Sequence, residues 1–90
     1  MNIVFLKGFE KEISKINDKK LALSIKLIIT TVTVSQDLAS IPNVKKLKGH
    51  KNAYRIRIGN HRIGFYFLNG VVTFAAFAYR KDIYTKFPLA

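Results

Sequence analysis

A chain of 90 residues is expected to form one domain, residues 1–90, with a modest core. Hydrophobic residues make up 49% and charged residues 23% of the chain, which argues against intrinsic disorder, and the absence of cysteine excludes a disulfide scaffold, a zinc ribbon and a thiol nucleophile. Sixteen Lys and Arg against five Asp and Glu give a net charge of +11, so we expect a polyanionic ligand or an acidic protein partner.

The beginning of the chain predicts a short strand and a first helix. Residues 2–6 read as a strand, and Phe9, Ile13 and Ile16 then recur at helical spacing with Lys and Glu between them. The apolar run at residues 1–6 is too short for a signal peptide and is followed at once by charged residues. We therefore expect a cytoplasmic protein without membrane contact.

A second helix is predicted from about residue 19 onward, with Asp18 as its N-cap. Its apolar face would consist of Leu21, Ile25, Ile28, Ile29 and Val32. Residues 28–34 are all β-branched and by themselves prefer a strand, but the spacing upstream has a period close to 3.6 and favours a helix. A loop is expected around residues 40–43, which contain serine, proline and asparagine.

The second half of the chain predicts a three-stranded antiparallel meander. Its strands would span residues 53–58, 61–68 and 71–78. The dipeptides Gly59-Asn60 and Asn69-Gly70 between them are typical two-residue hairpin turns. The predicted fold class is therefore α+β: an N-terminal strand, a two-helix hairpin, and a three-stranded antiparallel meander packed on the helices.

The two turns predict which residues face each other across the meander. The first places Arg57 opposite Arg62, and the second places Gly64 opposite Ala75 and Arg62 opposite Phe77. One face is then apolar and should be covered by the helices; it carries Tyr54, Ile56, Ile58, Ile63, Phe65, Phe67, Val72, Phe74 and Ala76. The other face, here called the arginine face, carries Arg55, Arg57, Arg62, Gly64, Tyr66, Thr73, Ala75, Phe77 and Tyr79.

The arginine face predicts a cradle for single-stranded nucleic acid. Like charges that face each other across two strands destabilise a sheet. Their presence here therefore favours a ligand that binds them. Guanidinium groups suit phosphate, and the rings of Tyr66 and Phe77 suit base stacking beside a depression at Gly64 and Ala75. An exposed face with incidental arginines is the alternative. No acid lies between Asp37 and Asp82, an interval that carries Lys45, Lys46, Lys48, Lys51, Arg55, Arg57, Arg62, Arg80 and Lys81.

Arg80 and Tyr84 are candidates for chemistry, because one helical turn would place their side chains on the same side. A phenol is a weak base in water, but nearby guanidinium groups favour its ionised form, which could deprotonate an RNA 2′-OH. Packing of an aromatic C-terminal turn is the alternative for Tyr84. The histidines, His50 in a polar loop and His61 after a turn, are expected to have ordinary roles. With so few histidines and acids, we expect no metal and no other cofactor.

Three segments, residues 45–49, 54–63 and 80–84, resemble the RelE/ParE toxin superfamily of bacterial and archaeal toxin–antitoxin systems, and its RelE branch most. The resemblance extends over nearly the whole chain. It implies a small α+β domain with an N-terminal strand, a helical hairpin and an antiparallel sheet. It also implies a metal-independent endoribonuclease that cuts messenger RNA in the ribosomal A site by 2′-OH attack, leaving a 2′,3′-cyclic phosphate and a 5′-OH.

The resemblance further implies roles for individual residues. Arg57, Arg62, Arg80 and Tyr84 are the expected catalytic residues: the tyrosine as general base, Arg80 for the leaving group or transition state, and the others for gripping phosphate. Many relatives have a histidine where this chain has Tyr79. The expected RNA-binding and phosphate-binding residues are Lys45, Lys46, Lys48, Arg55, Tyr66, Phe77 and Lys81.

The implied partners are a cognate antitoxin protein and messenger RNA on the ribosome, with contacts to 16S rRNA, so that the toxin inhibits translation. Two alternatives stay open. One is a ParE-like toxin that poisons DNA gyrase without nuclease activity. The other is a basic RNA-binding module with no toxicity.

Overall fold

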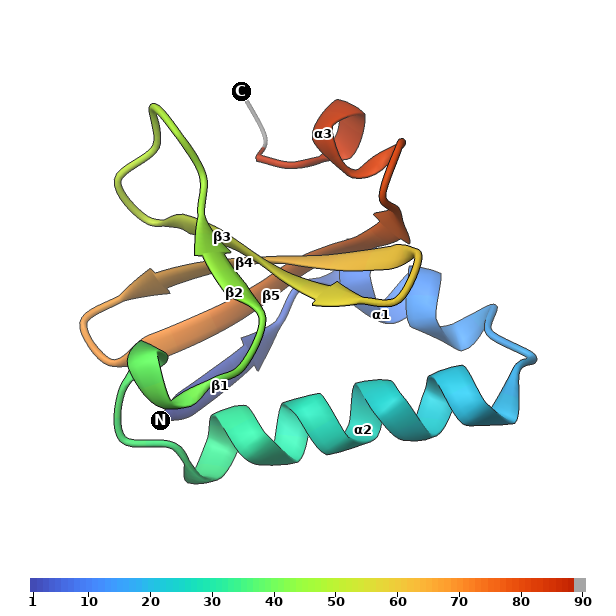
Figure 1. Cartoon of the computed structure of the whole chain (residues 1–90), viewed down its shortest axis with the longest axis horizontal. Coiled ribbons are helices and arrows are strands. Elements are labelled where there is room, and N and C mark those ends of the chain that lie inside the picture. The colour runs from blue at the N-terminus through green and yellow to red at the C-terminus, as the bar shows by residue number, and fades with distance from the viewer. Residues whose placement is uncertain (89–90) are drawn as a thin grey trace.

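Five strands form one mixed sheet, with helices on both of its faces (Figure 1). The computed structural model describes residues 1–88. The elements are β1 (Asn2–Phe5), α1 (Lys7–Ser14), α2 (Lys19–Val34), a 3-10 helix (Leu38–Ser40), β2 (Val44–Lys46), β3 (Ala53–Ile58), β4 (His61–Leu68), β5 (Val71–Tyr79) and α3 (Ile83–Lys86). The strand order is β1-β5-β4-β3-β2, and only the β1–β5 pair is parallel.

The predicted helix pair is confirmed. Asp18 caps α2: its Oδ1 accepts hydrogen bonds from the backbone N–H groups of Lys20, at 2.9 Å, and Leu21, at 3.2 Å. The β-branched run at residues 28–34 is helical throughout, because burial of Ile25 and Val32 against the sheet outweighs local strand preference. Threonine hydroxyls in this run donate to carbonyls four residues earlier, which satisfies them within the helix.

The predicted meander is confirmed, but the sheet is larger than three strands. β1 joins it by pairing with β5, and β2 pairs with β3 at the opposite edge. Strand β2 was not predicted, because it is three residues long and two of them are lysines. Short lysine-bearing strands are common at sheet edges, where they discourage pairing with other chains. Within residues 1–88, no helix is long and apolar enough to cross a membrane.

The predicted register of the second hairpin is correct near its turn and wrong farther away. Leu68 pairs with Val71 as expected, but a β-bulge shifts the register between Gly64 and Phe65. Beyond it, Gly64 pairs with Ala76 instead of Ala75. A bulge inserts one extra residue into one strand, which turns every following side chain to the opposite face of the sheet.

Two consequences follow from the bulge. Arg62 faces Ala78 rather than Phe77, and Phe77 lies on the helix-covered face, where it is 5% exposed and belongs to the main core. Ala76, predicted for the covered face, lies instead on the arginine face, and Tyr79, predicted for the arginine face, pairs with His61 on the covered face. The arginine face therefore has small alanine side chains along β5 where an aromatic ring was expected.

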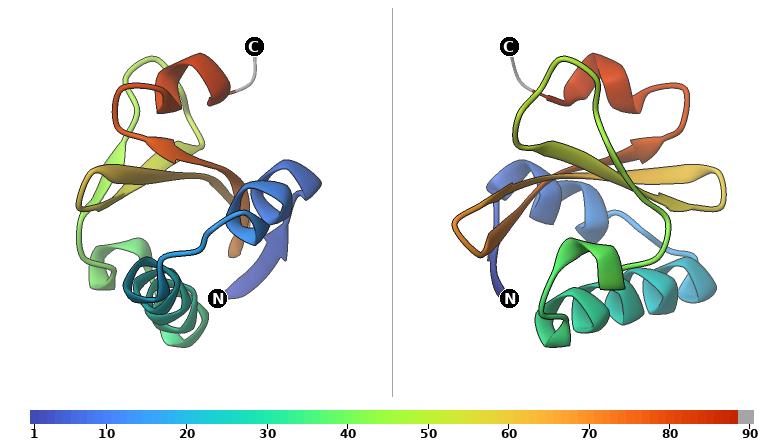
Figure 2. Two further views of the ribbon diagram at one scale, coloured as in Figure 1. Left: turned by 90° about the vertical axis from the view of Figure 1, so that its right-hand side faces the viewer. Right: turned by 60° about the vertical axis from the view of Figure 1, so that its left-hand side comes forward.

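The arginine face is partly covered by the end of the chain. Figures 1 and 2 show α3 on the opposite side of the sheet from α1 and α2. A second small core lies beneath α3 and consists of Ala53, Ala76, Ala78, Ile83 and Phe87. A Cβ atom added at Gly64 would lie 2.5 Å from the Phe87 ring. The depression predicted at Gly64 is thus filled by the protein's own phenylalanine.

Candidate active site

Arginines from two strands gather beside α3. Arg57 of β3 and Arg62 of β4 are direct cross-strand partners, as predicted, and Arg55 faces Gly64 two pairs further along, on the same face. Partial burial, followed by the positive charges of Arg55 and Arg57, lowers the pKa of the Arg62 guanidinium. An arginine nevertheless keeps its charge at all physiological pH values. Sheet pairing therefore concentrates positive charge at this site.

Arg80 and Tyr84 belong to the same cluster, although not for the reason predicted. Arg80 also lowers the pKa of Arg62, whereas the phenol of Tyr84 acts in the opposite direction, so both lie within electrostatic reach of that guanidinium. The predicted helical turn over residues 80–84 is wrong, because α3 begins only at Ile83. A turn precedes it, in which the N–H of Asp82 donates to the carbonyl of Tyr79 at 2.9 Å.

Backbone carbonyls hold two of the guanidinium groups in place. Arg62 Nη1 donates to the carbonyl of Gly59 at 3.0 Å and to that of His61 at 2.9 Å. Arg55 Nη1 donates to the carbonyl of Asn43, which precedes β2, at 3.2 Å. These bonds restrict the arginines without neutralising them, so their charge stays available to an anion.

α3 presents Tyr84 to solvent while anchoring itself through its neighbours. Ile83 and Phe87 are buried, at 0% and 1% exposure, whereas Tyr84 is 58% exposed. One side of this short helix therefore packs into the second core, and the other carries the phenol. The packing alternative for Tyr84 does not describe this geometry, since the ring is largely outside the core.

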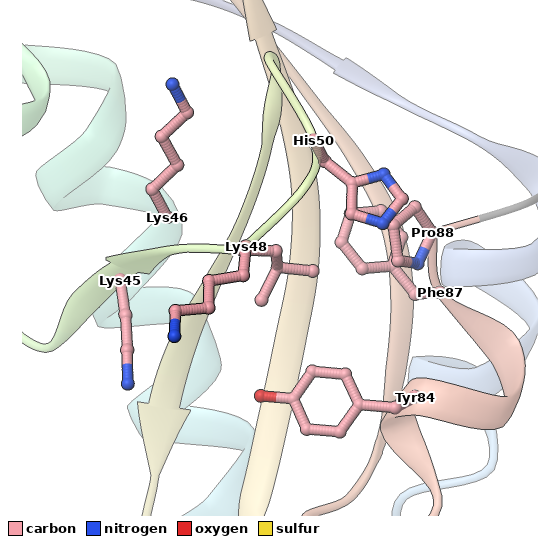
Figure 3. A pocket seen from close by; sticks show the side chains of 8 residues that line it. Lys45, Lys46, Lys48, His50, Tyr84, Phe87 and Pro88 are labelled. Carbon is pink, nitrogen blue, oxygen red and sulfur yellow. The ribbon is translucent and has the colours of Figure 1, made fainter.

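A pocket of about 500 Å³ adjoins Tyr84. It lies between α3 and the segment that contains β2 and the following loop, and it is lined by Lys45, Lys46, Leu47, Lys48, His50, Tyr84, Phe87 and Pro88. Figure 3 shows the Tyr84 hydroxyl pointing toward the side of the pocket where the ammonium groups of Lys45 and Lys48 lie. Three of the four lysines predicted to bind RNA therefore share a pocket with the tyrosine predicted to act as base.

Among the other residues predicted to bind RNA, the aromatic ones lie differently from the prediction. Phe77 is buried on the opposite face and cannot stack on a base. Tyr66 is partly buried, with its ring centroid 4.9 Å from that of Phe87, and so helps to seat the chain end. Lys81 is exposed in the turn before α3. His50, which was predicted to have only an ordinary role, also lines the pocket. The sequence signal that could have indicated this is its position within the basic run before β3.

Replacing Arg57 with alanine should leave the protein folded and equally or more stable, by up to about 1 kcal/mol, because it removes one of two opposed like charges. Arg62→Ala should gain less stability, since this substitution also removes hydrogen bonds to two carbonyls. Thermal unfolding at low and high salt measures the change in stability, and the gain in stability should shrink as salt screens the repulsion. A drop of more than ~5 °C in Tm for Arg57→Ala would instead make this side chain structural.

Within residues 1–88, no group of three or more His, Cys, Asp and Glu side chains is placed to hold a metal ion. The site thus consists of guanidinium and ammonium groups around one exposed phenol. Such a set can bind phosphate oxygens, stabilise added negative charge and, through the phenol oxygen, exchange a proton.

Comparisons with known proteins give the family. The chain is 37% identical to Toxin RelE3 of Methanocaldococcus jannaschii over 89 residues, which cover 98% of this chain and 100% of the relative. It superposes with a TM-score of 0.80 on a chain of the RelB–RelE antitoxin–toxin complex from Methanococcus jannaschii, at 36% identity, covering 94% of this chain and 99% of that one.

More distant structures share the fold. The YoeB dimer from Staphylococcus aureus matches with a TM-score of 0.72 at 23% identity, covering 89% of this chain and 97% of that one. The intact RelBE complex from E. coli matches with a TM-score of 0.68 at 20% identity, covering 87% of this chain and 94% of that one. No protein-family model matches the chain. The near-full-length identity to Toxin RelE3 nonetheless settles the relationship: the chain belongs to the RelE family of toxins.

Proposed function

We propose that this chain is the toxin of a toxin–antitoxin pair and acts as an endoribonuclease on messenger RNA at the ribosome, so that translation stops. The observation that carries the proposal is that Arg55, Arg57, Arg80 and the exposed Tyr84 of α3 all lie within electrostatic reach of Arg62. An RNA phosphodiester with its neighbouring 2′-OH suits this set, because guanidinium groups bind the phosphate oxygens and the phenol oxygen accepts a proton.

In the proposed reaction the ionised oxygen of Tyr84 takes the proton of the 2′-OH, and the 2′ oxygen forms a bond to the adjacent phosphorus. The bond from phosphorus to the 5′ oxygen of the next nucleotide breaks, and that oxygen takes up a proton from water. Arg57 and Arg62 bind the non-bridging phosphate oxygens, while Arg80 stabilises charge on the departing oxygen. The products are a 2′,3′-cyclic phosphate and a 5′-OH.

The lysines of the pocket would extend the binding site along the RNA. Lys45, Lys46 and Lys48 line the cavity beside Tyr84, and their charges suit the phosphates next to the cleaved one. Their compact ammonium groups bind phosphate as point charges, without the two-pronged geometry of arginine. We therefore assign them to binding and not to the chemical step.

Expression of the chain in bacterial cells, followed by mapping of message ends, tests the function. The ribonuclease proposal expects growth arrest with cut messages and unbroken DNA, and an Arg80→Ala chain should cut far less. Intact messages together with DNA breaks would instead identify a gyrase poison. Normal growth, with RNA bound but uncut, would leave only an RNA-binding module.

The proposed protein partner is an antitoxin. Relatives with this fold were solved as toxin–antitoxin complexes, including RelB–RelE from Methanococcus jannaschii and RelE–RelB from Pyrococcus horikoshii OT3. The net charge of +11 supports an acidic partner for this chain, because the positive charges of the arginine face repel one another when no partner is bound. We propose that the antitoxin brings acidic side chains to the arginine face or displaces α3.

Association with this antitoxin should be fast and sensitive to salt. Complementary charge raises the on-rate at low salt, so the rate should fall at least ~10-fold between low and high salt. Stopped-flow mixing of the chain with the antitoxin encoded beside it measures this, with Arg57→Ala as a variant expected to flatten the salt dependence. An on-rate that does not change with salt would contradict an electrostatic role for the arginine face.

A further inference from the structure

His61, the first residue of β4, stacks against two aromatic rings of β5. Its ring centroid is 5.1 Å from that of Phe77, with the planes 4° apart, and 4.4 Å from that of Tyr79, with the planes 29° apart. Tyr79 is its direct cross-strand partner. Phe77 can reach the imidazole only because the β-bulge turned it to this face of the sheet.

The turn that precedes His61, together with His61 itself, supplies carbonyls that accept hydrogen bonds from the Arg62 side chain and the Arg80 backbone. The carbonyls of Gly59 and His61 accept from Arg62 Nη1, and the carbonyl of Asn60 accepts from the backbone N–H of Arg80 at 2.8 Å. Three successive carbonyls, those of residues 59–61, thus fix the Arg62 guanidinium and the backbone from which the Arg80 side chain extends.

The tip of this turn is exposed to solvent. Gly59 and Asn60 form the tip of the β3–β4 hairpin, and both are exposed. Exposed hairpin tips open at low free-energy cost unless packing restrains them. The ring of His61, on the strand that leaves the tip, packs against β5 close to Arg80 and so ties the tip to the end of that strand.

We propose that His61 is a positioning residue of the site: its stacked ring holds the β3–β4 turn against the end of β5 and thereby sets the relative geometry of Arg62 and Arg80. The effect on rate rests on the proposed ribonuclease function, whereas the restraint on the turn does not. His61 acts from the helix-covered face, opposite to Arg62, so it does not touch the substrate.

The stacking requires a flat ring and not a particular charge. A phenylalanine at position 61 should therefore preserve the positioning, whereas an alanine should remove it. A purely structural histidine would behave differently: its loss would lower Tm but leave the kinetics of the folded protein unchanged. The pair of substitutions separates these two roles.

The test compares His61→Ala, His61→Phe and the unsubstituted chain, with Leu68→Ala as a matched control. Leu68 is the exposed last residue of the same strand, at its other end. For His61→Ala we expect kcat for message cleavage to fall about 10- to 100-fold with KM within about 3-fold, since small misplacements of charged groups cost rate more than binding. His61→Phe and Leu68→Ala should stay within about 3-fold of the unsubstituted chain.

Hydrogen exchange provides the readout that does not depend on catalysis. The Arg80 amide donates to the Asn60 carbonyl, so its protection should fall at least ~10-fold in His61→Ala and recover in His61→Phe. If His61→Ala does not fold, Tyr79→Leu removes the outer, exposed ring of the same stack and should give the same result.

Unchanged Arg80 protection in the alanine variant would overturn the proposal, as would a phenylalanine variant as defective as alanine. If the chain cuts no RNA at all, the proposed function fails, while the exchange measurement still decides whether His61 restrains the turn. Lost protection with unchanged kcat would limit His61 to a structural role and overturn its part in the reaction.

Discussion

A Tyr84→Phe chain should fold normally and still bind ribosomes, yet cleave messenger RNA about 10²–10⁴-fold more slowly, the usual cost of losing a general base. The substitution removes only the phenol oxygen, and the ring is 58% exposed, so packing changes little. Tyr54→Phe is the matched control, because that tyrosine stacks on Phe65 against the main core, on the face of the sheet opposite the arginines. Single-turnover cleavage on ribosome-bound message measures both variants.

Arg80→Ala should also be severe, because it removes positive charge from the site where negative charge develops in the transition state. If both Tyr84→Phe and Arg80→Ala still cleave at the unsubstituted rate, the catalytic assignment would have to move elsewhere on the arginine face. A Tyr84→Phe chain that stays fully toxic with intact messages and damaged DNA would contradict the ribonuclease proposal itself.

Gly64→Ala should cost stability, about 1–3 kcal/mol as for other overpacked sites, and should reduce cleavage. The added Cβ would lie 2.5 Å from Cγ and Cδ2 of Phe87, so the ring must leave its seat on β4. Phe87 and Ile83 anchor α3 in the second core, and α3 carries Tyr84. Displacing Phe87 should therefore misplace the phenol as well as loosen the fold.

Thermal unfolding and cleavage of Gly64→Ala should be compared with Gly8→Ala. A Cβ at Gly8, within α1, would lie 3.8 Å from the nearest atom, the carbonyl oxygen of Ala75, and alanine is the better helix former. Gly8→Ala should thus be neutral or slightly stabilising. A Gly64→Ala protein as stable as the unsubstituted chain would show that the packing of Phe87 does not require glycine at position 64.

The sequence predicted the parts of the fold that depend on local signals. The two-residue turn at residues 59–60 determined the β3–β4 register, and with it the Arg57–Arg62 pair, because a hairpin turn of fixed length leaves one pairing. The helix over residues 28–34 was predicted from the 3.6-residue period upstream and from the family resemblance, although every residue there prefers a strand. The turn and the helical period are both signals that neighbouring residues carry.

The prediction failed where distant segments decide the structure. The bulge in β5 has no marker in the sequence around Ala75 and Ala76, so Phe77 was assigned to the wrong face. Gly64 was interpreted as a hollow for a ligand, but it is the seat of Phe87, 23 positions later. Ile83 and Phe87 lie in a stretch too short to show a helical period, so the covering of the arginine face by α3 was not predicted.

The chemical nature of the new RNA ends tests the central claim most directly. A ribosome-bound message is incubated with the purified chain, and the fragments are analysed for their terminal groups. Attack by the 2′-OH, with Tyr84 as base, predicts a 2′,3′-cyclic phosphate on the upstream fragment, a 5′-OH on the downstream one, and no cleavage when the nucleotide at the cut carries a 2′-deoxyribose. Fragments with 5′-phosphates, or cleavage that persists at the 2′-deoxy position, would contradict the mechanism proposed for this site.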